Sequence, residues 1–78
     1  MKSDIHEELV RSRSHLESFK KILQERGPFG KKLDFICQEL NREFNTIGAK
    51  NLLSEVDSSI VTLKDSVEKI REQLRNVE

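Results

Sequence analysis

The stretch DFICQELNREFNTIGAK, residues 34–50, decides the fold of this chain. On a helix that turns about 100° per residue, its apolar side chains and the leucine before it fall in one sector. These residues are Leu33, Ile36, Cys37, Leu40, Phe44 and Ile47. The spacing predicts an amphipathic helix with one buried face.

The polar side of this helix is unusual for a helix that faces only solvent. Asn is a mediocre helix former, because its amide competes with the backbone for hydrogen bonds. A narrow stripe about 120° from the apolar sector forms what we call the polar signature face. Its members are Asp34, Gln38, Asn41 and Asn45. Two interpretations are open: an ordinary solvated helix, or a face that contacts a ligand or another subunit.

The chain before this helix predicts another helix over residues 4–26. Asp4 and Glu7 resemble a capping box at its start, and the run Gly27-Pro28-Phe29-Gly30 ends it. Between these signals, residues with 4-3-4-3-4 spacing form a heptad seam with one polar member. They are Ile5, Leu9, Ser12, Leu16, Phe19 and Leu23.

The chain after residue 50 has the cleanest periodicity, with 3-4-3-4-3-4-3 spacing, and predicts a long heptad helix over residues 51–77. Its seam consists of Leu53, Val56, Ile60, Leu63, Val67, Ile70, Leu74 and Val77. The first helix is too short to cover this seam completely, so the second helix or another chain must cover the rest. Gly48 either breaks the chain between the second and third helices or is tolerated within one long rod. We expect a break, with the second helix over residues 31–45.

Composition narrows the class of protein. Seventy-eight residues form one domain at most, and a chain this short is marginally stable without help from oligomerisation or a metal. The single cysteine, Cys37, excludes an internal disulfide, suits a reducing cytoplasm and is expected to be a buried thiol. No signal peptide or membrane span is visible. The sequence therefore predicts an all-α, oligomeric domain over residues 1–78, either an antiparallel helical hairpin or a three-helix bundle.

Charge is balanced overall, with 14 basic and 14 acidic residues, but it is unevenly distributed. Five basic residues surround the predicted loop, namely Lys20, Lys21, Arg26, Lys31 and Lys32. Such a patch is suited to binding the phosphates of RNA. A helix C-terminus also favours basic residues through its dipole, which is a sufficient structural reason for Lys20 and Lys21. Both interpretations stay open at this point.

Five segments of the chain resemble the C-terminal domain of YicC-like bacterial endoribonucleases, nearly end to end. The segments are DIHEELVR (4–11), SHL (14–16), GKKLDF (30–35), residues 38–50 and EKIREQLRNVE (68–78). The resemblance implies an excised C-terminal domain, with an added Met, of a longer cytoplasmic enzyme. It further implies metal-dependent hydrolysis of RNA phosphodiester bonds by a homo-oligomer, a hexamer in full-length members. Two places depart from the family pattern: Ala49 replaces a usual Ser, and Leu52-Leu53 replaces Asn-Asp.

RNA hydrolysis assigns roles to several side chains under this resemblance. Mn²⁺ or Mg²⁺ would bind carboxylates, for which the candidates are Asp34, Glu39 and Glu43. The catalytic candidates are His15, Glu39 and Glu43. His15 is the candidate general acid or base, because imidazole exchanges protons near neutral pH. The RNA-binding candidates are Lys20, Lys21, Arg26, Lys31, Lys32, Arg42 and Lys50.

Each role has a structural alternative. The acids pair with basic residues on the surface, His15 covers the edge of the core, and Arg42 bridges Glu39 instead of binding phosphate. The alternative function is a helical oligomerisation or RNA-binding module, with catalysis in a missing N-terminal domain. No DNA or membrane partner is expected.

Overall fold

A computed structural model describes residues 5–25, 28–50 and 54–77 of the chain. Within these ranges the chain forms three helices, α1 (His6–Leu23), α2 (Gly30–Lys50) and α3 (Ser54–Val77). The prediction of an all-α fold is confirmed. None of the helices in the described part is long and apolar enough to cross a membrane.

The helix ends differ from the predicted bounds at several points. The proposed cap Asp4 lies outside the described residues, and Ile5, which occupies the N-cap position, makes no side-chain capping bond. The C-terminus of α1 tightens at Leu23, because the N–H groups of Gln24 and Glu25 donate to the carbonyls three residues earlier. Acidic residues in the first turn of α1 and basic residues in its last turn complement the helix dipole.

Helix α2 extends five residues beyond its predicted end at Asn45 and includes Gly48. A glycine inside a helix costs about 1 kcal/mol, so neighbouring contacts must offset it. Ile47 is buried beside the glycine, and the Lys50 side chain reaches Glu8 of α1. These contacts favour continuation of the helix to Lys50. The helix therefore passes through Gly48 without the predicted break, and α2 and α3 are separate helices in the described part of the chain.

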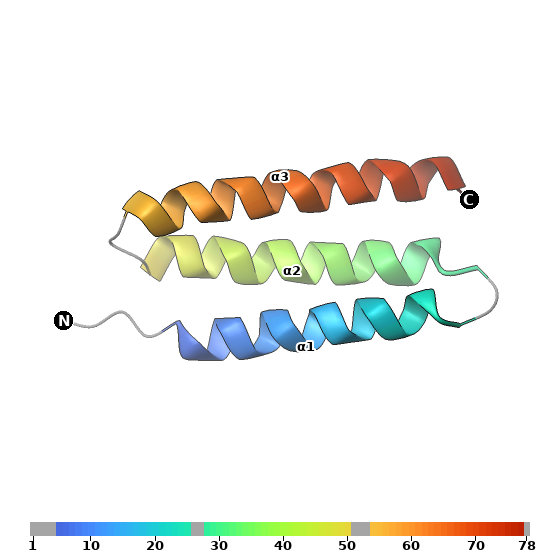
Figure 1. The fold of residues 1–78 in the computed structure, drawn as a ribbon, viewed down its shortest axis with the longest axis horizontal. Helices are drawn as coiled ribbons and strands as arrows, with labels where there is room; N and C mark the ends of the chain where they lie inside the picture. Colours follow the sequence, from blue (N-terminus) through green and yellow to red (C-terminus); the bar gives the residue numbers. More distant parts are fainter. Residues whose placement is uncertain (1–4, 26–27, 51–53, 78) are drawn as a thin grey trace.

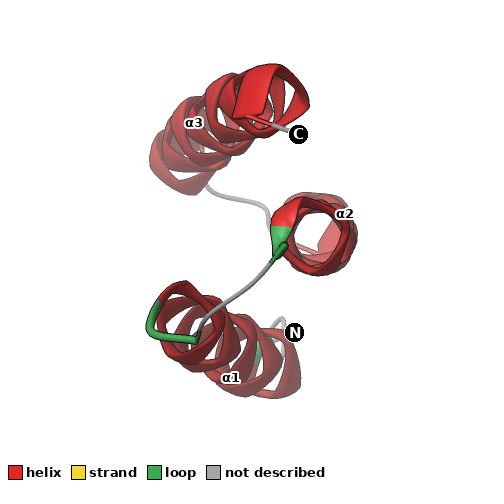
Figure 2. Ribbon diagram, turned by 90° about the vertical axis from the view of Figure 1, so that its right-hand side faces the viewer, coloured by secondary structure: helices red, strands yellow, loops and turns green. Residues whose placement is uncertain are grey.

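The three helices run antiparallel in sequence order, with α2 in the middle (Figure 1). Helix α2 packs against both neighbours, whereas the described residues of α1 and α3 do not pack against each other. Viewed along the helix axes, α2 lies to one side of the line joining α1 and α3 (Figure 2). The molecule is therefore an open V in cross-section, with α2 at its apex.

The core follows the apolar sector of α2. All six residues predicted for that sector are buried, and Ile60 and Val67 of α3 complete the cluster from the other side. Phe19 and Ile22 of α1 pack against its edge. Burial of Cys37 confirms the predicted structural thiol, and desolvation raises the pKa of that thiol.

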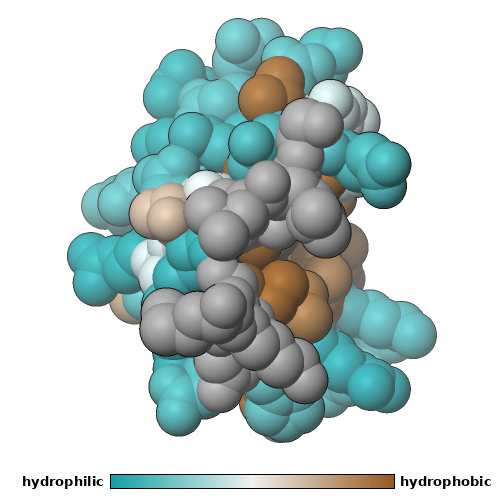
Figure 3. All heavy atoms as spheres, turned by 90° about the vertical axis from the view of Figure 1, so that its left-hand side faces the viewer, coloured by the Kyte–Doolittle hydropathy of each residue, from teal (hydrophilic) through white to brown (hydrophobic). Residues whose placement is uncertain are grey.

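Five apolar side chains of the two outer helices are half-exposed at heptad spacing, and we call the surface that they form the open face. They are Leu9, Leu16 and Leu23 of α1 and Leu63 and Ile70 of α3. Figure 3 shows hydrophobic surface between the α3 side at the top and the α1 side at the bottom of the molecule. These five side chains lie outside the core cluster of the chain.

Candidate functional site

The polar signature face of α2 lies against α3. Arg71 Nε donates to Asp34 Oδ1 at 2.7 Å, and the Asn41 amide donates to Glu68 at 3.1 Å. Further along, Lys64 donates to Asn45. A hydrogen bond from Arg71 holds the pKa of the Asp34 carboxyl below its usual range. The unusual amide and acid side chains therefore have a structural role: they form polar contacts along the seam between α2 and α3.

On the other side of α2, the seam with α1 contains a cluster of charged side chains, which we call the buried charge cluster: Glu8, Arg11, Glu43 and Lys50. The two carboxylates are almost inaccessible, with Glu8 2% and Glu43 6% exposed. Arg11 Nε lies 3.1 Å from both carboxylate oxygens of Glu43. Lys50 Nζ lies 2.7 Å from Glu8 Oε2, and Arg11 approaches the same oxygen at 3.5 Å. Each buried acid therefore has a cationic partner, as burial of a charge requires.

The electrostatics favour the charged forms of Glu8 and Arg11. The hydrogen bond from Lys50 lowers the pKa of Glu8, and the bond to Glu43 raises the pKa of Arg11. Two polar atoms on this side of α1, Glu8 Oε1 and Ser12 Oγ, are buried and lack a hydrogen-bond partner within the described part of the chain. The Arg11 side chain remains 48% exposed, so its guanidinium group is fixed by buried acids but reaches the surface.

Helix geometry aligns the predicted catalytic residues along this same seam. Because α1 and α2 are antiparallel, one turn forward from Arg11 corresponds to one turn backward from Glu43. His15 and Glu39 therefore lie at the same level of the seam, one turn from the Arg11–Glu43 pair. His15 also lines an open pocket beside the seam with Lys31, Lys32 and Phe35, among other residues. The structure thus places all three catalytic candidates on adjacent turns.

The predicted metal ligands are not brought together in the same way. Asp34 faces α3 and pairs with Arg71, whereas Glu43 faces α1 and pairs with Arg11. Glu39 lies 3.9 Å from Arg42, which is the bridge considered as the structural alternative for that arginine. Across the described ranges, no three His, Cys, Asp or Glu residues are placed to hold a metal ion. Asp34 and Glu43 therefore stand on opposite flanks of α2, as the helical repeat requires, and do not share one site.

The predicted RNA-binding residues fall in three places. Four exposed lysines, Lys20, Lys21, Lys31 and Lys32, flank the connection between α1 and α2, and Lys32 lies 3.6 Å from Glu25. Arg26 lies outside the described residues. Arg42 is exposed further along α2, whereas Lys50 takes part in the buried charge cluster. A basic surface therefore surrounds one end of the molecule.

Sequence reasoning missed three notable residues. Arg11 and Arg71 are the cations that pair with the acids of α2, and nothing in a helical pattern identifies a partner more than thirty residues away. Phe35 is the third, because it is 61% exposed although it stands within the helix that forms the core. The sequence signal for an exposed Phe35 is its position outside the predicted apolar sector.

Comparison with known proteins gives a consistent result along the whole chain. Residues 1–78 match the family model described as "Endoribonuclease YicC-like, C-terminal". A probable endoribonuclease YicC of Clostridioides difficile (strain 630) is 44% identical over 77 residues, which cover 99% of this chain and 26% of that protein. A probable endoribonuclease YicC of Haemophilus influenzae (strain Rd) is 44% identical over 75 residues, which cover 96% and 26%. The chain spans about a quarter of these relatives' length.

Proposed function

The chain belongs to the YicC-like endoribonuclease family as its C-terminal domain, and from this premise we propose that it supplies RNA-contacting and catalytic side chains to an enzyme that hydrolyses RNA phosphodiester bonds. The observation that carries the proposal is Arg11, which two buried acids hold in place beside His15. Both relatives are named probable endoribonucleases and are about four times as long as the matched segment. The activity proposed is that of the longer protein.

Phosphodiester hydrolysis needs charge stabilisation, a base for the nucleophile and an acid for the leaving group. A guanidinium group that is fixed in advance stabilises developing phosphate charge without reorganising during the reaction. Arg11 fits this role because Glu43 and Glu8 fix its direction while about half of its side chain remains accessible. Glu43 then acts as a positioning residue, through Arg11, and does not touch the RNA.

His15 is the proton-transfer residue in this proposal. It lies one turn from Arg11 on the same face of α1, at the level of Glu39 on α2. A carboxylate at this level would orient the imidazole ring during proton transfer. Lys31 and Lys32 line the pocket that contains His15 and would attract the RNA backbone towards the histidine.

A divalent metal remains a prediction from the family resemblance. The acids proposed as ligands are occupied by arginine partners on opposite sides of α2. If the whole enzyme uses Mn²⁺ or Mg²⁺, ligands from outside this set of three residues must complete the site. No step proposed for Arg11 or His15 depends on the ion.

The test is cleavage of a labelled, structured RNA by the 78-residue chain, with Mn²⁺ or with EDTA in its place. We expect His15→Ala to reduce cleavage about 100-fold or more, the usual contribution of a general acid or base. His6→Ala, at the exposed first turn of α1, is the matched control and should cleave as the parent chain does. Equal cleavage by the His15→Ala and parent chains would contradict the assignment. Loss of cleavage in EDTA would support the metal prediction.

Assembly of subunits is the second candidate function, and the open face favours it. Leu9, Leu16 and Leu23 repeat every seven residues along α1 and are half-exposed, as expected of a helix that packs against another chain. We expect Leu16→Lys to lower the mass measured by sedimentation. Val10→Lys is the control, because Val10 is as exposed as Leu16 but is turned about 100° from Leu9 around the helix. An unchanged mass in both variants would exclude the open face as an interface.

A further inference from the structure

Phe35 is the one large apolar side chain of α2 that the fold leaves outside its buried face. The other six apolar residues that we predicted for this helix are buried, whereas Phe35 is 61% exposed. Building on the proposed action on RNA, we propose that Phe35 is a stacking platform for an unpaired RNA base, with Lys31 and Arg75 contacting the adjoining phosphates. This assigns a base-binding residue, in addition to the residues proposed for catalysis.

Two open pockets flank the Phe35 ring. One, with a volume of about 470 Å³, lies between α2 and α3 and is lined by Asp34, Gln38, Leu74 and Arg75, among others. The other, of about 510 Å³, lies between α1 and α2 and contains His15. The two pockets share only Phe35 and Lys31. A base on the aromatic ring would therefore place its neighbouring nucleotides over a pocket on each side.

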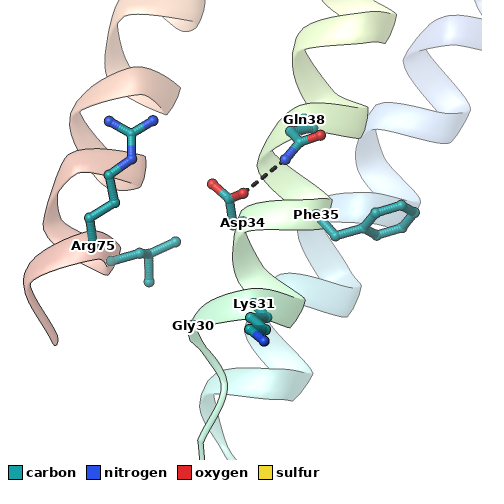
Figure 4. Close-up of a pocket in the computed structure, with 7 residues that line it drawn as sticks. Gly30, Lys31, Asp34, Phe35, Gln38 and Arg75 are labelled. Atoms are coloured by element: carbon teal, nitrogen blue, oxygen red, sulfur yellow. Dashed lines mark hydrogen bonds between the residues drawn. The ribbon is translucent and has the colours of Figure 1, made fainter. Parts of the chain in front are cut away.

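The directions of the side chains agree with this arrangement. Figure 4 shows the Phe35 ring directed away from α3, with Arg75 on the opposite side of Asp34. The Asp34 carboxylate, which would repel a phosphate, already accepts hydrogen bonds from Gln38 and Arg71. The hydrogen bond from Arg71 and the nearby charge of Arg75 offset this acid, and Arg75 and Lys31 are the cations that line the pocket.

Charge around the aromatic ring favours a polyanion. Lys31, Lys32 and Arg75 line the two pockets, and Lys20 and Lys21 are exposed at the end of α1 nearby. Lys32 has Glu25 at 3.6 Å, whereas Lys31 and Arg75 have no ion pair among the described residues. Exposed aromatic rings set among cations are the usual means of binding single-stranded nucleic acid, because every base has a face that can stack.

A protein partner explains this surface less well. Protein interfaces are depleted of lysine at their centres, and the apolar residues that resemble such a centre lie on the open face instead. The Phe35 surface offers one aromatic ring surrounded by lysine and arginine. A contact between subunits at Phe35 is therefore the alternative that the experiment must detect.

The chain contains no Trp and no Tyr, so Phe35→Trp creates a single fluorescent reporter at the proposed platform. We would titrate this variant with an eight-nucleotide oligouridylate, an oligoadenylate of equal length and a blunt RNA duplex. Both single strands should quench the fluorescence, and the duplex, which has no unpaired base, should not. Anisotropy of labelled oligoadenylate measures binding by the parent chain in the same solutions.

Matched variants separate stacking from charge. Phe35→Leu keeps an apolar side chain but removes the aromatic face, so we expect about tenfold weaker binding with the same salt dependence. Lys31→Gln should weaken binding and reduce the slope of log affinity against log salt by about one. Val10→Ala is the control for loss of an exposed apolar residue and should bind as the parent chain does.

The outcomes distinguish this inference from the proposed function on which it rests. If the parent chain binds none of the RNAs, both fail. If it binds oligoadenylate, but Phe35→Leu binds equally well and Phe35→Trp is not quenched, only the stacking platform fails. If Phe35→Leu lowers the sedimentation mass, Phe35 is a contact between subunits, and the platform is again overturned.

Discussion

Helix α2 packs against α1 and α3 through two seams. Both seams contain charged side chains, but in different surroundings. Towards α1, the acids Glu8 and Glu43 are almost completely buried and depend on Arg11 and Lys50. Towards α3, Asp34 pairs with Arg71, but its side chain is 32% exposed and remains in contact with water. The first seam therefore encloses its two carboxylates, whereas the second keeps Asp34 at the rim of the apolar core.

The difference separates a candidate reactive site from a set of structural contacts. Buried charges are costly to maintain, and replacing them with apolar residues often stabilises a protein. Charges at a rim cost little and fix which helix faces meet. The α1–α2 seam is therefore where a functional reason for the charges is needed, and it is the seam that also brings His15 and Glu39 to one level.

Of the substitutions proposed here, replacement of Arg11 should lower the free energy of unfolding most, because it weakens the α1–α2 seam. Arg11→Ala leaves Glu43 buried without its cation, which we expect to lower the free energy of unfolding by about 2–3 kcal/mol. The value lies below that for a fully buried pair, because half of the arginine side chain reaches water. Urea unfolding at fixed chain concentration, followed by circular dichroism, measures the change.

Arg13→Ala is the control for this substitution. Arg13 lies on the same helix and pairs with Glu17 at 3.6 Å, but both side chains are largely exposed. Such surface pairs contribute about 0.5 kcal/mol or less. If Arg11→Ala and Arg13→Ala cost the same, the buried charge cluster does not stabilise the seam, and the contrast between the two seams disappears.

Acid should weaken both seams, and it provides the second test. The pKa values of Glu8 and Asp34 are lowered in the folded chain by Lys50 and Arg71, respectively. Carboxyl groups with a depressed pKa add stability above their unfolded pKa values, about 4, and this stability is lost as the pH falls through the folded values. We therefore expect the free energy of unfolding to decline below about pH 4.

Single substitutions then assign the acid sensitivity to one seam or the other. Glu8→Gln and Asp34→Asn should each flatten the decline, because each removes one of the groups responsible. Asp65→Asn changes an exposed acid on α3 and should leave the decline as it is. A decline of unchanged steepness in both test variants would show that neither seam determines acid stability.

The coupling between Asp34 and Arg71 should be smaller. A double-mutant cycle with Asp34→Asn and Arg71→Gln should yield about 1 kcal/mol, since the two side chains are 32% and 20% exposed and their atoms lie 2.7 Å apart. The exposed pair Asp65 and Lys69, at 3.2 Å, provides a cycle for comparison and should yield less. Equal coupling energies would place Asp34 and Arg71 among ordinary surface pairs.

The sequence predicts the faces of α2 but not which helix packs against each face. The apolar sector and the polar stripe follow from the helical repeat, and burial of all six apolar members confirms the first of them. The repeat does not say which helix meets the stripe, because Asp34 and Arg71 are 37 residues apart and depend on how α3 rotates about its axis. For the same reason, Glu43 looks like an exposed acid until Arg11 is found beside it.

The site could be predicted less completely than the fold. His15, Glu39 and Glu43 were selected by their chemistry, and the antiparallel packing places them on one seam. The helical repeat puts Asp34 on one flank of α2 and Glu39 and Glu43 on the other, and the structure pairs Asp34 with Arg71 of α3 and Glu43 with Arg11 of α1. Spacing along a helix identifies side chains on one face, but two faces of one helix supply two different seams.

The smallest expected effect on stability is at Gly48, where α2 packs against Ile60 of α3. The glycine lies inside α2, and a Cβ atom added there would meet Ile60 Cγ2 at 3.8 Å, an ordinary contact distance. Gly48→Ala should therefore raise the free energy of unfolding by about 0.5–1 kcal/mol, because alanine loses less backbone entropy on folding. Ala49→Gly, at the next and exposed position, is the matched reverse and should destabilise by a similar amount.

If Gly48→Ala destabilises the chain, α2 needs a flexible residue at this point. The predicted break near Gly48 would then describe a real property of the helix, and contacts with Ile60 would tolerate no added methyl group.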